Sequence, residues 1–148
     1  MPQYQKAVEK ARVTEALTLA NSMRKAIDLY VLEKGFSGGD NAVWFFGPQN
    51  HEDLVSPDIE ITKSLTCRID NYGITPFCYK DRIAYVAYCG DDGACRIHIG
   101  DILPEWLDRD EYAAGDWENY YIEFIKDPFT GKWKTACDGP QYICSLAQ

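Results

Sequence analysis

The chain of 148 residues contains no long hydrophobic run. No stretch approaches the roughly 18 consecutive apolar residues that a helix needs to cross a bilayer. The first residues also lack the basic region, apolar segment and small-residue cleavage site of a secretory signal. The sequence as given therefore holds neither a membrane span nor a cleavable signal.

Motifs of the common enzyme classes are missing as well. The sequence has no Gly-x-Ser-x-Gly, Walker loop, His-Glu-x-x-His or Rossmann glycine pattern. Two acidic clusters, residues 91–93 and 108–111, lack the spacing of a known calcium loop and are typical of solvated turns. We therefore expect a non-enzymatic protein without a cofactor or a bound metal.

Positive charge is scarce: 15 Lys and Arg stand against 23 Asp and Glu, a formal net charge of -8. An acidic domain repels phosphate backbones, so we expect no general nucleic-acid binding. Residues 1–34 differ, with six basic and four acidic side chains. In an assembly, the basic helix of one subunit would then face the acidic head of another. Two solvated faces of one domain explain the asymmetry equally well.

Six cysteines are present, and none of them forms a C-x-x-C motif. A structural zinc site and free buried thiols are possible readings, but disulfides formed in an oxidising compartment are favoured. Six cysteines allow 15 pairings. We favour the local ones, because the cysteines bracket short turn-like segments. The favoured pairs are Cys67 with Cys78, Cys89 with Cys95, and Cys137 with Cys144.

Residues 3–34 are dominated by helix-forming residues and contain neither glycine nor proline. Pro2 suits the first turn of a helix, and Gly35 is a typical stop. Apolar residues then recur at every third or fourth position. This stripe consists of Val13, Leu17, Ala20, Met23, Ile27, Tyr30 and Val31. We predict that the second half of the helix packs on a sheet, while the first half protrudes.

Residues 35–58 are rich in glycine, proline and asparagine and predict a connecting loop. The apolar island 43–46 predicts a small satellite core that fastens this loop to the domain; a contact patch for a neighbouring subunit is the alternative. Residues 59–148 predict an antiparallel sheet region, interrupted at 103–117, where 103–107 would start a short helix or loop. The predicted strands are 59–61, 64–69, 77–79, 82–89, 95–99, 120–126 and 132–136. One domain of the α+β class follows, over residues 1–148.

The opening residues carry a more specific pattern. Pro2-x-Tyr4 is followed by Ala11-Arg12-Val13-Thr14-Glu15-Ala16-Leu17. This order resembles the segment just after the transmembrane half of type IV pilins, where a motif like Ala-Arg-Val-x-Glu-Ala-Leu follows such a step. The resemblance continues through residues 19–27 and ends at 30–35. It implies a pilin-like fold, in which one long helix packs on an antiparallel sheet and a disulfide closes the C-terminal loop, here Cys137 with Cys144.

The resemblance also implies a function. A pilin subunit assembles into an extracellular filament through an apolar helix, which here would precede residue 1 together with a short basic leader and a prepilin-peptidase site. Its partners would be other pilin subunits and the inner-membrane assembly machinery, and it would reside in the inner membrane before assembly. The side chains expected to lie between neighbouring heads are Lys6, Lys10, Arg12 and Glu15. The four further cysteines depart from the usual single pair and leave the subfamily open.

Two alternatives stay within this family. Residues 127–133 are faintly similar to the Asp-Pro-Trp-Gly motif of type II secretion pseudopilins, although Phe129 and Thr130 interrupt it. A minor pilin acting as an adhesin or DNA-binding module would use exposed aromatic residues such as Trp44, Trp106 and Trp117. Packing of these rings in the domain is the simpler interpretation of each.

Overall fold

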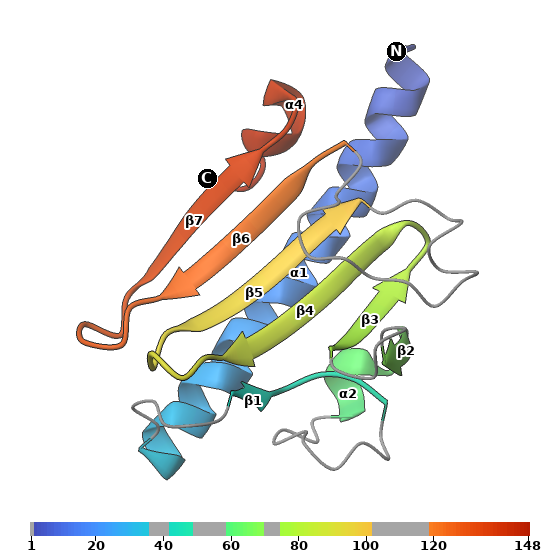
Figure 1. The fold of residues 1–148 in the computed structure, drawn as a ribbon. Coiled ribbons are helices and arrows are strands. Elements are labelled where there is room, and N and C mark those ends of the chain that lie inside the picture. Colours follow the sequence, from blue (N-terminus) through green and yellow to red (C-terminus); the bar gives the residue numbers. More distant parts are fainter. Residues whose placement is uncertain (1, 36–41, 49–58, 70–74, 102–118) are drawn as a thin grey trace.

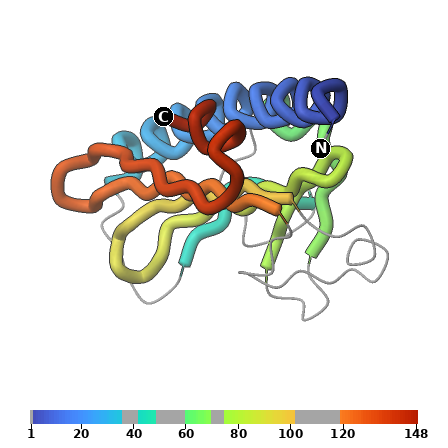
Figure 2. Tube along the Cα trace, turned by 90° about the horizontal axis from the view of Figure 1, so that it is seen from above, coloured from blue at the N-terminus to red at the C-terminus, as the bar shows by residue number. Residues whose placement is uncertain are grey.

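The computed structural model of the chain describes residues 2–35, 42–48, 59–69, 75–101 and 119–148. In these residues a long N-terminal helix lies across an antiparallel sheet, which makes the fold α+β (Figure 1). Viewed from above, the helix and the sheet form two layers (Figure 2). No helix in these ranges is both long and apolar enough to cross a membrane.

Helix α1 runs from Gln3 to Lys34. Pro2 precedes it in an extended conformation, and Gly35 ends it in the left-handed region, with φ 65° and its N–H donating to the Val31 carbonyl oxygen at 2.8 Å. The side chains that α1 buries are spaced three or four residues apart: Val13, Ala16, Ala20, Met23 and Ile27. No residue between Pro2 and Arg12 is buried. The first turns of α1 therefore lie outside the core, but Val13 and Ala16 are already buried, so the protruding part is shorter than the predicted half of the helix.

The sheet is an antiparallel meander in the order β2-β3-β4-β5-β6-β7. A short strand, β1, pairs with the end of β4 on the same edge as β3. The strands are β1 (Val43–Trp44), β2 (Thr66–Ile69), β3 (Pro76–Lys80), β4 (Ile83–Cys89), β5 (Cys95–Asp101), β6 (Tyr121–Lys126) and β7 (Trp133–Asp138). Two short helices, α2 (Ile59–Thr62) and α4 (Gln141–Cys144), complete the described elements.

The main core lies between α1 and one face of the sheet. Alternate residues of β4, from Ile83 through Tyr85 and Ala87 to Cys89, belong to this core, because successive side chains of a strand point to opposite faces. The centre of β5 contributes Ile97 and Ile99 in the same way. On the opposite face, Phe77 and Val86 form a second cluster with the half-buried rings of Trp44, Tyr79 and Tyr88.

Two sequence-based predictions for short segments were wrong. Ile59-Glu60-Ile61 was predicted as a strand but opens helix α2, where Glu60 pairs with Lys63 one helical turn on, at 3.7 Å. Three residues are too few for alternation to separate a strand from a helix. The island 43–46 is not a satellite core in a loop: Val43 and Trp44 form β1, while Phe45 and Phe46 are buried in the main core.

Three disulfides join the local pairs that the sequence analysis favoured. Cys67 lies opposite Cys78 across β2 and β3, and Cys89 lies opposite Cys95 across β4 and β5. The third disulfide links Cys137 at the end of β7 to Cys144 in α4. All six cysteines are therefore used.

Candidate functional site

The face of α1 that points away from the sheet has an unusual composition. We call it the outward stripe; its members, all exposed, are Tyr4, Ala7, Ala11, Thr14, Thr18, Ser22, Lys25, Leu29 and Leu32. They share one side of the helix, because they repeat every three or four residues in antiphase to the buried positions. Lys25 is the only charged member. Small side chains thus fill the middle of a surface on which a solvated helix normally carries charges.

Large apolar side chains are exposed at both ends of the outward stripe. Tyr4 is 79% exposed near the first turn, and Leu29 and Leu32 are 55% and 81% exposed near the last. Among the described residues only one other large hydrophobic side chain, Phe129, is comparably exposed. Fully burying such a side chain is worth about 1.5–3 kcal/mol. The stripe therefore offers substantial apolar area to a partner.

The three aliphatic hydroxyl groups of the stripe hydrogen bond within the helix. Thr14 donates to the carbonyl oxygen of Lys10 at 2.8 Å, and Thr18 donates to that of Thr14 at 3.0 Å. Ser22 donates to the Thr18 carbonyl oxygen at 3.5 Å, a long contact. A polar group that already has a partner loses little when water is removed. A neighbouring surface can cover these three side chains at low cost.

The four predicted assembly residues do not share this face. Lys10 and Arg12 are exposed on opposite flanks of the stripe. Lys6 is half-buried, with its ammonium 5.5 Å from the centre of the Tyr142 ring. Glu15 pairs with Lys80 at 2.7 Å, and this hydrogen bond is the main reason that the pKa of Lys80 is raised. The structure thus engages Lys6 and Glu15 within the chain, and their role between subunits stays a prediction.

Two open hollows flank the N-terminal half of α1, and Arg12 lines both. The smaller, of about 290 Å³, lies on the side of β3 and β4 and includes Glu15, Lys80 and Tyr85. The larger, of about 500 Å³, lies at the end of the sheet near the start of α1. We call the larger one the N-terminal hollow; it is lined by Tyr4, Gln5, Val8, Glu9, Arg12, Arg82, Ile83, Asp101, Asn119 and Tyr120.

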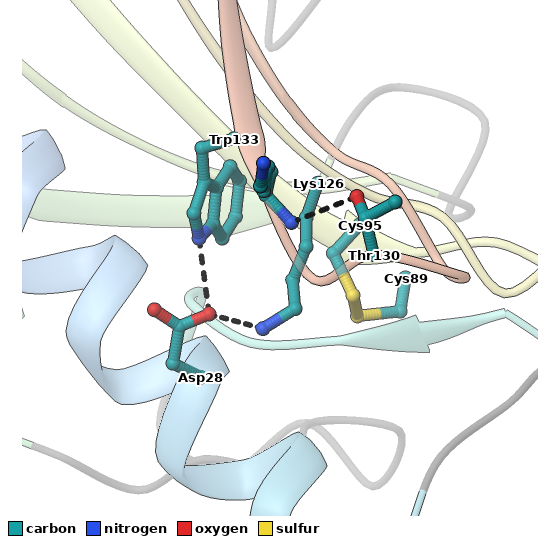
Figure 3. A network of polar contacts seen from close by, with 7 residues as sticks. Asp28, Cys89, Cys95, Lys126, Thr130 and Trp133 are labelled. Atoms are coloured by element: carbon teal, nitrogen blue, oxygen red, sulfur yellow. Dashed lines mark hydrogen bonds and ion pairs between the residues drawn. A yellow bond between two sulfur atoms is a disulfide. The ribbon is translucent and has the colours of Figure 1, made fainter.

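The second half of α1 is fixed to the sheet by a polar network. The Asp28 carboxylate accepts from the Trp133 Nε1 at 3.0 Å and from the Lys126 ammonium (Figure 3). Lys126 lies directly opposite Cys95 on the neighbouring strand, so the network adjoins the Cys89–Cys95 disulfide. These contacts tie α1 to the β6–β7 hairpin through one flank of the helix. The outward stripe remains free of them.

The C-terminal tail meets the first half of α1. The Tyr142 hydroxyl donates to the Glu9 carboxylate at 3.1 Å, and the Cys137–Cys144 disulfide holds α4 beside β7. This contact explains why Glu9 is half-buried although it lies in a charged, polar turn. The tail therefore steadies the protruding part of the helix from the sheet side.

A titratable cluster occupies the sheet face away from α1. The Tyr121 hydroxyl lies 2.5 Å from His98 Nδ1 and also hydrogen bonds to the Glu123 carboxylate. The Tyr88 ring stacks on the imidazole with centroids 5.6 Å apart. Burial lowers the pKa of His98, the Glu123 charge opposes that shift, and Arg96 adds to it. Sequence reasoning missed this cluster, because its members lie on separate strands and alternate with core residues.

Within the described ranges no three His, Cys, Asp or Glu side chains converge as metal ligands. Asp92 accepts from Arg96 and from the Ala94 N–H, and Asp127 accepts from two N–H groups of its own turn. Trp44 is half-buried, with its ring 5.1 Å from that of Tyr88. The short segment 103–107, the acidic cluster 108–111, Trp106 and Trp117 fall outside the described residues.

The outward stripe was also missed by sequence reasoning, which followed only the apolar residues of the core face. Its signal was present: Leu29 and Leu32 lie out of phase with the predicted core stripe. Comparison with known proteins does not add to this picture, since no family model, curated protein or solved structure matches the chain.

Proposed function

We propose that the chain is the head region of a structural subunit of a type IV pilus-like extracellular filament. The observation that supports this most is the outward stripe: a 32-residue helix buries one face on its own sheet and exposes a nearly uncharged face along its length. The pilin-like order of residues 2–17 supports it independently. On this proposal α1 continues an apolar helix that precedes residue 1 in the full-length protein.

Assembly then follows from burial on both faces of one helix. The face carrying Val13, Ala20 and Ile27 holds the head together. The outward stripe packs against a neighbouring copy, where small side chains in its middle allow close approach and the apolar ends supply buried area at about 25 cal/mol per Å². One surface patch that binds a different patch on the next copy generates an open helical filament. Other pilin subunits and the inner-membrane assembly machinery are the partners that this proposal requires.

The disulfides fit a head that works outside the cytoplasm. Disulfides persist in oxidising compartments, and all six cysteines are paired. Two of the bonds cross the sheet between neighbouring strands, and the third fastens the C-terminal tail. A pseudopilin or a minor pilin would use the same arrangement of disulfides. The location of the native protein separates these alternatives: a major filament subunit is found in the sheared surface fraction, whereas a pseudopilin or a minor pilin is found in the cell envelope.

A matched pair of substitutions tests the stripe. Thr18→Arg puts a charge in its centre, and Thr135→Arg makes the same change at an exposed position of β7. Arginine is a good helix former, so the head should still fold. We expect cells carrying Thr18→Arg in the full-length gene to lose most of the filaments sheared from their surface, at equal cellular protein levels, while Thr135→Arg leaves the yield unchanged. A normal yield of sheared filaments from Thr18→Arg cells would show that assembly does not use the outward stripe.

A further inference from the structure

The turn between β6 and β7 presents a single aromatic side chain to solvent. Phe129, at its tip, is 95% exposed. The turn is held in one shape: the Asp127 carboxylate accepts from the Phe129 N–H at 2.7 Å and from the Thr130 N–H at 3.1 Å. Gly131 adopts φ 71° and donates to the Asp127 carbonyl oxygen at 2.9 Å. Thr130, visible in Figure 3, accepts from the Lys132 N–H at 3.3 Å. A preorganised projection of this kind loses little entropy on binding.

The N-terminal hollow lies at the opposite end of the molecule. It is built from the start of α1, the β3–β4 turn, the end of β5 and the start of β6, whereas the β6–β7 turn lies at the other end of the same strands (Figure 1). Its volume of about 500 Å³ exceeds that of a phenylalanine side chain. Tyr4, which is also the first member of the outward stripe, and Val8 give it an apolar wall. Tyr120 lines it as well but is only 4% exposed, and most of the other lining side chains are polar or charged.

Charges in the two regions suit contact between them. Arg12 and Arg82 line the hollow beside Glu9 and Asp101, and Arg82 pairs with Asp101 at 3.2 Å. Guanidinium groups near an inserted ring add cation–π attraction. The turn carries one acidic side chain, Asp127, and one basic side chain, Lys132. Neither region therefore presents a net charge that would repel the other.

We propose that the β6–β7 turn of one copy of this chain docks in the N-terminal hollow of the next copy, with Phe129 packed against Tyr4 and Val8. This inference rests on the proposed function, to which it adds a head-to-tail contact between successive heads. The two surfaces differ and lie at opposite ends, so the contact repeats without closing. An exposed aromatic side chain entering a pocket is the typical centre of such an interface.

Photo-crosslinking decides the contact. p-Benzoylphenylalanine replaces Phe129 in one sample and Asp91, an exposed residue of the neighbouring β4–β5 turn, in a matched control. Each is mixed with an isotopically labelled copy of the chain, so that mass spectrometry separates links between copies from links within one copy. The mixture is irradiated both as sheared full-length filaments and as the concentrated 148-residue chain.

We expect probe 129, but not probe 91, to link to residues 4–12, 82–83 or 119–120 of another copy. Val8→Trp, which fills the hollow, should lower that yield at least fivefold, and Phe129→Ser should weaken association of the heads about tenfold or more while Phe129→Tyr retains it. Links to other surfaces, or none above the control, would overturn the contact even if filaments form. Failure of the full-length gene to make filaments would overturn the proposed function, and the links formed by the 148-residue chain would still decide the contact.

Discussion

His98 is a mostly buried side chain from which we expect the head to become sensitive to acid. The Tyr121 hydroxyl has a single proton, and the Glu123 carboxylate can only accept it. On this assignment of the Tyr121 proton, His98 Nδ1 carries a proton and donates to the Tyr121 oxygen. His98 Nε2 is buried and, among the described residues, has no hydrogen-bond partner. Burial disfavours the charged imidazole, and protonating Nε2 would add an N–H that has no acceptor among the described residues; both agree with the lowered pKa of His98.

We predict that the head loses stability as the pH falls below about 6.5, the value of an unperturbed histidine. Between that value and the lowered pKa of folded His98, the unfolded chain binds the extra proton and the folded chain does not. The free energy of unfolding then falls by up to about 1.4 kcal/mol per pH unit. Urea unfolding from pH 8 to pH 5 measures this slope, and His98→Gln should flatten it. An unchanged slope in His98→Gln would contradict the assignment.

Asp28 supports the helix at the residue scale. Its own side chain is 46% exposed, but that of Lys126 is only 12% exposed. Asp28→Ala leaves the Lys126 ammonium and the Trp133 N–H without their acceptor, which should cost about 1–3 kcal/mol in urea unfolding. Lys126→Met removes the buried charge and keeps the stem, so it should cost less. If Lys126→Met were the more destabilising variant, the network would not be held by Asp28 as described.

Individual residues differ in how far the sequence predicts them. The disulfide partners follow from short spacings around turns, because a local pair closes whenever the turn forms. Asp28, Lys126 and Trp133 meet only after α1 has packed across the sheet, with about 100 residues between helix and hairpin. His98, Tyr121 and Glu123 depend on the register of two strands in the same way. Contacts between residues so far apart in the sequence leave no local sequence pattern from which they could be predicted.

At the scale of elements, the long helix and the longer strands were predictable. A 32-residue run without Gly or Pro and the alternation in β4 are strong signals. The short elements α2 and β1 were not, because tertiary packing decides the conformation of two to four residues. Pairing with β4 makes Val43–Trp44 a strand, and packing on the main core fixes Ile61 in α2.

Gly139 joins two elements, β7 and α4, and has no room for a side chain. A Cβ atom there would lie 2.6 Å from the Tyr120 Cβ and 3.2 Å from the Asn119 carbonyl oxygen. We predict that Gly139→Ala destabilises the head by about 3 kcal/mol, since the strands must shift. Gly131→Ala should cost only about 1 kcal/mol, because it meets strain at φ 71° but nothing within 4 Å. Thermal unfolding of the two variants measures these losses of stability. Equal losses would contradict the prediction, because they would show that the β7–α4 junction can shift to make room for the added methyl group.

At the scale of the whole molecule, α1 has one face buried on the sheet and one exposed face, the outward stripe, to which we assign assembly in the proposed function. The sheet face of α1 was predictable from its apolar period, and it holds the two layers together. The outward stripe was not recognised from the sequence, because small and hydroxyl-bearing residues are common on any protein surface. Only the pattern of burial along α1 shows that these residues share one exposed side. The case for a binding surface rests on the joint exposure of Tyr4, Leu29 and Leu32. That exposure depends on how α1 packs in the folded head and cannot be read from one segment.

The central claim, that this chain is the head of a filament subunit, is tested most directly on the native protein. Surface material is sheared from cells that express the native gene, and the intact mass and N-terminal peptide are determined by mass spectrometry. We predict a form in the sheared fraction that carries a processed, apolar N-terminal extension before residue 2, with all six cysteines oxidised. A native protein that begins at Met1 and stays in the cytosol with free thiols would contradict the account.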